Sequence, residues 1–336
     1  MDTGYGTMMD QFQQLIERCR NLIEQQLRVF MRKSPPRPRF VAEPVHYILA
    51  KRGKRIRPVL LLLACKAVNG RIGDALPAGV AVELLHNFTL VHDDIMDNAT
   101  TRRGRATVHT KWDQSTAILV GDELIALAYR SLLQAKSSRL RAILDTFTQA
   151  FVAVCEGQGL DKEFEAQRRV SLGRYLTMIE QKTARIVSAS AEIGALVGGG
   201  TAQQVDALRK YGLHLGCAFQ VQDDLLDVVA DESRFGKTAG ADIVSGKKTY
   251  LLVRALQKAK GADRDLLVRV VRRNALIEPN VPRIRAIYEK YDIFGEARRT
   301  AKEETERAKR AISMLPSQRG RAALNSFADL LLDRNF

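Results

Sequence analysis

Two groups of three aspartates, each at the end of an apolar helical stretch, constrain this chain more than any other feature. The first group, Asp93, Asp94 and Asp97, follows the apolar run Leu84–Val91. At 3.6 residues per turn, Asp93 and Asp97 share one helix face. Because Asn98–Gly104 has a loop-like composition, we expect these acids near a helix C-terminus. The helix macrodipole already places negative charge there, and neighbouring acids repel one another.

A bound cation removes both unfavourable interactions. Mg²⁺ prefers oxygen ligands and is commonly held by one or two carboxylates, with phosphate oxygens completing its shell. Arg102 and Arg103 follow directly in the sequence, and arginine suits a phosphate-bearing ligand. Considered alone, the first group is also compatible with an ordinary solvated acidic helix end.

The second aspartate group repeats the spacing of the first. Asp223, Asp224 and Asp227 end a long apolar helical pattern, and the polar turn Ala230–Thr238 follows. Basic residues come within and after this turn, at Lys237, Lys247 and Lys248. Two acid groups at helix ends, each followed by cations, predict two walls of one metal–diphosphate site.

Helical periodicity runs through nearly the whole chain, without an alternating strand pattern or a repeat. Helices are expected at Met8–Arg32, Val41–Ala50, Trp112–Leu133, Leu140–Cys155 and Leu172–Leu196 and, after a Thr201–Gln204 capping box, up to Asp227. Breaks are expected at Gly198–Gly200, Lys260–Gly261, Glu278–Asn280 and Leu315–Pro316. The pattern therefore predicts an all-α chain with one domain over 1–336, in which 1–40 form an N-terminal helix and a Pro-rich turn.

The composition limits the location and the partners. With 336 residues and 46% hydrophobic content, the chain can build a substantial core. Its net charge of +15 is compatible with nucleic acid, an anionic membrane or phosphorylated substrates, but no basic run with interleaved aromatics indicates nucleic-acid binding. The four cysteines show no metal spacing, and Val59–Ala64 is too short to cross a bilayer. We expect a cytoplasmic protein without stable membrane insertion.

A third motif, Gly53-Lys-Arg-Ile-Arg-Pro58, precedes the first acid group. With it, the chain resembles the trans-isoprenyl diphosphate (polyprenyl) synthases from about Ile48 to its C-terminal helix, and most closely their geranylgeranyl type. The motifs follow the family's order: G-K-R-x-R-P, E-x-x-H, D-D-x-x-D, R-R-G, G-Q-x-x-D, K-T, F-Q-x-x-D-D, G-K-T and G-K-K-T. The resemblance implies a helical bundle with a central cavity, a homodimer and a role in isoprenoid biosynthesis.

The resemblance also assigns roles to individual residues. Metal binding, with three Mg²⁺ ions in each active site, falls to Asp93, Asp94, Asp97, Asp223 and Asp227. Isopentenyl diphosphate binding falls to Lys54, Arg57, His86 and Arg103, and allylic diphosphate binding to Arg102, Lys182, Lys237 and Lys247. Thr183 and Gln220 assist near C1, Asp224 belongs to the catalytic set, and Gln158 and Asp161 lie near the metal cluster. From the residues alone, other interpretations stay open: a solvated basic loop at Lys54, a core histidine at His86 and a snorkelling lysine at Lys182.

The reaction implied by the resemblance begins when diphosphate leaves an allylic substrate. The resulting carbocation is attacked by the double bond of isopentenyl diphosphate, and the proton is lost to the released diphosphate. The residues four and five positions before Asp93, Thr89 and Phe88, are implied to form the floor of the tail channel. One small and one aromatic residue there indicate a C20 product. By periodicity alone, Thr89 lies more directly below Asp93 than Phe88 does.

Other functions fit the sequence less well. Farnesyl diphosphate (C15) and longer polyprenyl diphosphates are alternative products. A terpene cyclase would not need a second diphosphate site, and a non-catalytic subunit should have lost acids from one group. A basic nucleic-acid-binding protein would explain +15 but not six ordered aspartates.

Overall fold

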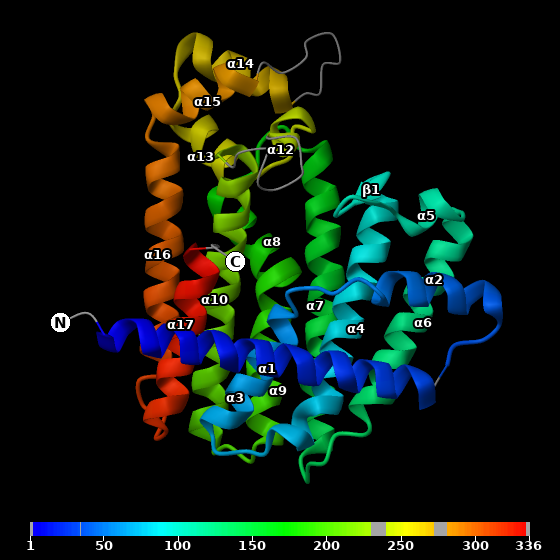
Figure 1. Cartoon of the computed structure of the whole chain (residues 1–336). Coiled ribbons are helices and arrows are strands. Elements are labelled where there is room, and N and C mark those ends of the chain that lie inside the picture. The colour runs from blue at the N-terminus through cyan, green and yellow to red at the C-terminus, as the bar shows by residue number, and fades with distance from the viewer. Residues whose placement is uncertain (1–2, 34, 230–239, 272–280, 334–336) are drawn as a thin grey trace. The chain divides into compact units, whose positions relative to one another are not determined.

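The computed structural model describes residues 3–33, 35–229, 240–271 and 281–333 (Figure 1). Over these residues the regular structure is helical apart from one pair of two-residue strands, which confirms the predicted all-α class. The chain divides into two compact units. The first unit comprises Met1–Gln149, Ala189–Arg209 and Ile312–Phe327, and the second comprises Ala150–Ser188, Lys210–Ala311 and Ala328–Phe336. The single domain and the central cavity stay predictions.

The helices follow one another with short connections. The N-terminal part holds α1 (Thr3–Lys33), α2 (Arg39–Leu49), α3 (Ile56–Ala67), α4 (Ile72–Met96), α5 (Val108–Lys111), α6 (Gln114–Leu132) and α7 (Leu140–Ala166). The middle holds α8 (Leu172–Ile179), the π-helix η1 (Glu180–Ala184), α9 (Arg185–Val197) and α10 (Ala202–Val229). The C-terminal part holds α12 (Ala241–Val244), α13 (Tyr250–Lys258), α14 (Gly261–Val271), α15 (Val281–Lys290), α16 (Ile293–Ala311) and α17 (Gln318–Asp333).

The core of the first unit is built on α3 and α4. Both helices bury residues all round, as expected of a helix surrounded by neighbours: Leu60–Leu63 of α3 are at most 2% exposed. The first-unit part of α9 approaches α3 closely at Gly194, where a Cβ atom would lie 2.2 Å from the carbonyl oxygen of Leu61. A side chain at this position would therefore force the two backbones apart.

Helices α4 and α6 pack along each other in the first unit. At Gly121 of α6 a Cβ atom would lie 2.0 Å from Nε2 of His92, so the ring of His92 fills the space beside the glycine. The glycine thus allows α4 and α6 to pack tightly at this position. The contact fixes the part of α4 that directly precedes the first acid group.

One short hairpin interrupts the helical pattern where the sequence indicated only loop. Strands β1 (Thr101–Arg102) and β2 (Arg105–Ala106) pair antiparallel. The two residues between them, Arg103 and Gly104, have φ angles of 53° and 73°. Two consecutive positive φ angles are typical of a type I′ turn, which directs the chain back on itself.

The second unit has its own apolar core. Helices α8, α10, α13, α15 and α16 contribute buried residues to it, among them Tyr175, Val221, Leu225, Leu251 and Ile287. The rings of Tyr175 and Tyr250 meet edge to face with their centroids 6.1 Å apart. This core lies beneath the second acid group, because Val221 and Leu225 alternate with the acids along α10.

The predicted helix Leu172–Leu196 is not continuous. Five residues, Glu180–Ala184, form a π-helix between α8 and α9. A π-helix inserts one extra residue per turn and is frequent at functional sites. Periodicity could not reveal it, because the residues on either side keep the helical pattern.

The prediction that the helix from Leu140 ends at Cys155 was wrong, because α7 continues to Ala166. Gly157 lets α7 continue as a helix while it packs closely against the π-helix, because glycine has no side chain. A Cβ atom at Gly157 would lie 2.3 Å from the backbone nitrogen of Lys182, so the glycine allows α7 to touch the π-helix. Of the helices in the described ranges, none is both long enough and apolar enough to span a bilayer.

Replacing Gly157 by alanine tests this contact. Gly157→Ala should lower the free energy of unfolding by about 2–3 kcal/mol, because a backbone atom blocks the added methyl group. Gly159→Ala is the matched control on the same helix, since nothing lies within 4 Å of its Cβ position, and it should stabilise by up to about 1 kcal/mol. Thermal unfolding of both variants measures the difference. Equal effects of the two substitutions would contradict the close contact.

Candidate active site

The first acid group lies where predicted, at the C-terminal end of α4. The helix ends in a Schellman motif: the N–H of Ala99 donates to the carbonyl of Asp94, and the N–H of Asn98 to that of Ile95. Asn98 has the left-handed conformation (φ 51°) that this motif requires. Asp93 is half-buried, Asp94 buried and Asp97 exposed. The last helical turn therefore presents three carboxylates in three different environments.

The hairpin brings Arg102 back onto α4. Its Nε donates a 2.6 Å hydrogen bond to Oδ1 of Asp94, whose carboxylate is nearly inaccessible. Burial raises the pKa of Asp94, while the positive charge and hydrogen bond of Arg102 oppose that rise. The structure thus gives Asp94 a task besides the predicted metal binding, which is to hold Arg102 in place.

The basic turn Lys51–Arg55 precedes α3, and Arg57 in the first turn of α3 lies near His86 together with Arg103 of the hairpin. The pKa of His86 is lowered well below its usual value, first by burial and then by the positive charge of Arg57 and Arg103. The imidazole is therefore neutral near pH 7, and the charge for binding an anion comes from its neighbours. Arg103 lies near the same residues: partial burial lowers its pKa, the negative charge of Glu83 opposes this change, and the nearby Arg102 and Arg55 lower the pKa further.

Arg55 is a residue of this turn that the sequence did not single out. Its side chain is buried and makes ion pairs with Glu24 of α1 and Glu83 of α4. Its partners lie 31 and 28 positions away in the chain, so no local motif could have indicated the contact. Lys54 beside it is exposed, and Arg57 is half-buried.

The predicted chain-length residues occupy different surroundings on α4. Phe88 is 8% exposed, and its ring lies against that of His92 with the centroids 4.7 Å apart. Thr89 is half-buried, and its hydroxyl donates to the carbonyl of His86. Phe88 thus belongs to the packed face of α4, next to the contact between His92 and Gly121.

In the second unit, the π-helix presents Lys182 and Thr183 together. Lys182 Nζ donates to Oδ2 of Asp161 at 2.7 Å, so Asp161 and Lys182, predicted for different tasks, form one ion pair. The hydroxyl of Thr183 donates to Oε1 of Gln220 at 2.8 Å. Gln158 of α7 is buried.

Asp224 connects this arrangement to the core. One of its oxygens accepts from the hydroxyl of Tyr175 (2.5 Å) and the N–H of Tyr250 (2.8 Å), and the other accepts from Nε2 of Gln220 (2.9 Å). Burial raises the pKa of Asp224 to about 7, and the hydrogen bond from Tyr175 opposes that rise. The chain of hydrogen bonds from Tyr175 through Asp224 and Gln220 fixes the hydroxyl of Thr183.

The two remaining aspartates of the second group lie farther out. Asp223 is exposed, and Asp227 accepts a 3.0 Å hydrogen bond from the N–H of Asp242. Lys247 lies 3.8 Å from a carboxylate oxygen of Asp242. Lys237 lies outside the described residues. Among the residues that the structure does describe, no three His, Cys, Asp or Glu side chains converge closely enough to form a metal cage.

The profile of the family described as "Polyprenyl synthetase" matches residues 38–290. This chain belongs to the polyprenyl synthetase family. It is 38% identical to a short chain isoprenyl diphosphate synthase of Methanothermobacter thermautotrophicus, over 88% of this chain and 91% of that protein. It is 42% identical to a geranylgeranyl diphosphate synthase of Methanosarcina mazei, over 68% and 71%.

A solved structure supports the same family. The geranylgeranyl pyrophosphate synthetase of Pyrococcus horikoshii matches with a TM-score of 0.90 and 33% identity, over 97% of this chain and 100% of that one. As a polyprenyl synthetase the chain is a trans-prenyltransferase. The family assignment made from the ordered motifs is thereby confirmed, while the roles of individual residues stay predictions.

The pairing of Asp94 with Arg102 can be tested by a double-mutant cycle. Asp94→Asn and Arg102→Ala should each raise the KM for the allylic substrate by about tenfold, because each releases the other side chain. If the two act as one unit, the double variant should be little worse than either single one. Strictly additive losses in kcat/KM would show that Asp94 acts independently of Arg102.

Proposed function

We propose that this polyprenyl synthetase makes geranylgeranyl diphosphate (C20) from isopentenyl diphosphate and allylic diphosphates, in a reaction that requires Mg²⁺. The observation that carries the proposal is the gathering of Arg57, Arg102 and Arg103 around His86, beside a helix that ends in carboxylates. Such a concentration of positive charge favours an anion with several oxygens. Relatives named geranylgeranyl diphosphate synthase support the product length.

The cluster around the basic turn is proposed to bind isopentenyl diphosphate. Lys54, Arg57 and Arg103 supply charge, and the neutral imidazole of His86 supplies a directed hydrogen bond. Because the lowered pKa keeps His86 uncharged, the diphosphate faces three cations rather than four. The hydrogen bond from His86 thus orients the diphosphate, and the three cations attract it by charge.

The allylic diphosphate is assigned to Arg102, Lys182, Lys237 and Lys247. In this proposal the ion pair with Asp161 positions Lys182, and the bond with Asp94 positions Arg102. Both cations are therefore held before substrate arrives, which lowers the entropy lost on binding.

The hydroxyl of Thr183 is proposed to face the carbon from which diphosphate leaves. Its proton is used in the hydrogen bond to Gln220, so the oxygen lone pairs are what it can offer to a positive charge. Gln220 holds this orientation because its amide group donates to Asp224. The residues thereby present negative partial charge where a carbocation develops.

The carboxylates at the ends of α4 and α10 fit Mg²⁺. Asp93 and Asp97 lie one turn apart on α4, and Asp223 and Asp227 repeat this spacing on α10. Mg²⁺ rarely takes an all-protein cage and normally combines one or two carboxylates with phosphate oxygens, which suits residues that do not form such a cage themselves. Bound Mg²⁺, proposed as three ions, would neutralise the diphosphate leaving group.

Homodimeric assembly and a cytoplasmic location complete the proposal. Both rest on the resemblance to the family and on the sequence. Light scattering after size-exclusion chromatography measures the first, and fractionation of the source cells measures the second.

The direct test of the proposed function is elongation of labelled isopentenyl diphosphate. Purified protein is incubated with Mg²⁺ and, in separate reactions, with the C5, C10 and C15 allylic diphosphates, and product length is analysed. A C20 product from the accepted starters supports the proposal. C15 as the final product would make the chain a farnesyl diphosphate synthase, longer products a long-chain synthase, and cyclised hydrocarbon a terpene cyclase.

Dependence on a divalent cation is the first consequence. Asp93→Ala or Asp223→Ala should lower kcat by about a thousandfold or more with the fold intact, because each removes a carboxylate rather than packing. Asp74→Ala, at the start of α4, is the control and should retain activity. Circular dichroism checks the fold, and steady-state kinetics with and without chelator measures the effect. Full activity in excess chelator would refute the metal requirement.

Product length is the second consequence. Phe88→Ala should give C25 or longer chains, because it removes a buried ring from α4, and one turn of helix, about 5.4 Å, is close to the length of one isoprene unit. Thr89→Phe should shift the product toward C15. Phe40→Ala, at an exposed phenylalanine of α2, is the control and should leave the product at C20. An unchanged product from Phe88→Ala would remove Phe88 from the account and direct attention to the buried Leu85.

A further inference from the structure

Arg55 occupies an unusual backbone position in the basic turn. It precedes α3 and has a left-handed conformation, with φ 49° and ψ 39°. Residues other than glycine rarely adopt this conformation unless the surroundings impose it. Because Lys54 is its neighbour and Arg57 follows in the first turn of α3, the conformation of Arg55 determines where both of these cations lie.

The side chain of Arg55 is held by three acceptors. Its Nε donates to Glu24 at 2.8 Å, its Nη1 donates to Glu83 at 2.5 Å, and its Nη2 donates to the carbonyl of Lys51 at 3.2 Å. The side chain is 3% exposed, and those of Glu24 and Glu83 are 8% and 6% exposed. All three nitrogens of the guanidinium group thus contact protein acceptors, so Arg55 is placed to hold the turn rather than to bind substrate.

Glu83 is itself fixed on α4. Nδ2 of Asn87, one turn later, donates to the same carboxylate oxygen of Glu83 that accepts from Arg55. His86 and the first acid group belong to the same helix. The contact between Arg55 and Glu83 therefore sets the position of the basic turn against the helix that carries the rest of the predicted isopentenyl diphosphate site.

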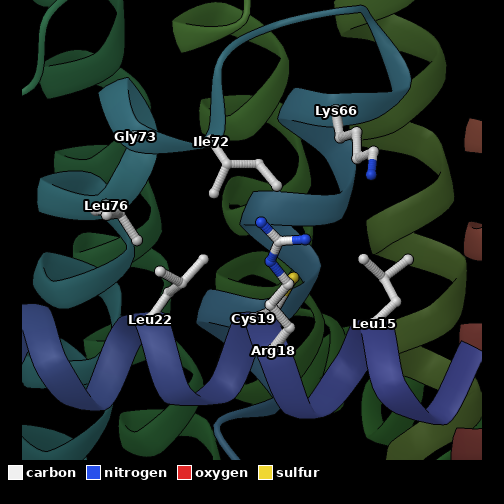
Figure 2. A pocket seen from close by; sticks show the side chains of 8 residues that line it. All are labelled: Leu15, Arg18, Cys19, Leu22, Lys66, Ile72, Gly73 and Leu76. Atoms are coloured by element: carbon white, nitrogen blue, oxygen red, sulfur yellow. The ribbon is translucent and has the colours of Figure 1, made fainter.

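Glu24 links α1 to the basic turn through its hydrogen bond with Arg55. Beside it, Ile23 is fully buried and fills the space over Gly79 of α4, where a Cβ atom would lie 2.5 Å from the Cδ1 atom of Ile23. The preceding turns of α1 pack less closely: a hollow of about 300 Å³ lies between them and the α3–α4 segment, and Figure 2 shows Leu15, Cys19 and Leu22 directed into it. Ile23 and Glu24 thus hold this part of α1 beside the basic turn.

We propose that Glu24, Arg55 and Glu83 form a positioning clamp through which α1 sets the affinity for isopentenyl diphosphate. This inference rests on the proposed function, because it takes Lys54 and Arg57 as the residues that bind that substrate. The clamp neutralises Arg55 with two carboxylates and orders the turn in advance. Loss of the clamp leaves the cations present but misplaced, and the geometric precision of diphosphate binding is lost.

Glu24→Gln separates positioning from charge. Removing a carboxylate makes the surroundings more positive and by itself would strengthen the binding of an anion. Loss of positioning has the opposite sign, so the clamp predicts that the KM for isopentenyl diphosphate rises by about tenfold, while the KM for the allylic substrate stays within about twofold. Glu17→Gln is the matched control, since Glu17 lies on the same helix in an exposed pair with Arg20.

Arg55→Lys tests the same clamp with the charge conserved. Lysine cannot reproduce the forked contact to two carboxylates, so the KM for isopentenyl diphosphate should again rise. Arg52→Lys, at an exposed arginine of the same turn, should change nothing. In the double variant with Glu24→Gln, the rise should be smaller than the product of the single effects, because both substitutions break one unit.

The outcomes distinguish this inference from the proposed function. Lys54→Ala is measured in parallel and should raise the same KM. If Lys54→Ala has no such effect, the proposed substrate site is wrong. If Lys54→Ala raises the KM for isopentenyl diphosphate but Glu24→Gln lowers it or leaves it unchanged, only the clamp is wrong. Equal changes in both KM values, or a lower thermal midpoint and lower kcat with both KM values unchanged, would show a purely structural role and overturn the clamp.

Discussion

Carboxylates gathered against the dipole of a helix are the constraint on which the functional residues of this protein depend. At the end of α4, three aspartates share the turn at which the helix carbonyls already concentrate negative charge. Within the first unit, the structure offsets one of them by the contact between Asp94 and Arg102. Asp93 and Asp97, one turn apart, are the two proposed to share a metal cation. The Schellman motif and the hairpin therefore serve the same end, because together they return Arg102 to the helix.

The second unit meets the same constraint in a different way. Asp224 is buried and accepts hydrogen bonds from Tyr175, Tyr250 and Gln220, which reduces the cost of placing a carboxylate in the core. This leaves Asp223 and Asp227 as the outer acids of the group. In both units the middle aspartate is thus the most buried of its group, and the flanking pair, one turn apart, is the one proposed to bind metal.

Features that depend on local pattern could be predicted from the sequence. The capping box was one, since Thr201 and Gln204 exchange the expected hydrogen bonds, and the end of α4 at the acids was another. The π-helix could not be predicted, because insertion of one residue leaves the apolar periodicity on both sides intact. The ion pairs of Arg55 depend on tertiary folding, and no local rule links Glu24 to that turn. For the hairpin, the only indication in the sequence was Gly104 after Arg103, because glycine readily adopts the positive φ angle that such a turn requires.

The metal is proposed to be held jointly by the carboxylates and by the oxygens of a diphosphate. Thermal unfolding of the wild-type protein with Mg²⁺, with inorganic pyrophosphate and with both tests it most directly. Ligands that bind the folded state raise the unfolding temperature. We expect small shifts with either ligand alone and a shift larger than their sum with both, and this excess should be absent in Asp93→Ala. A full shift with Mg²⁺ alone would contradict the account.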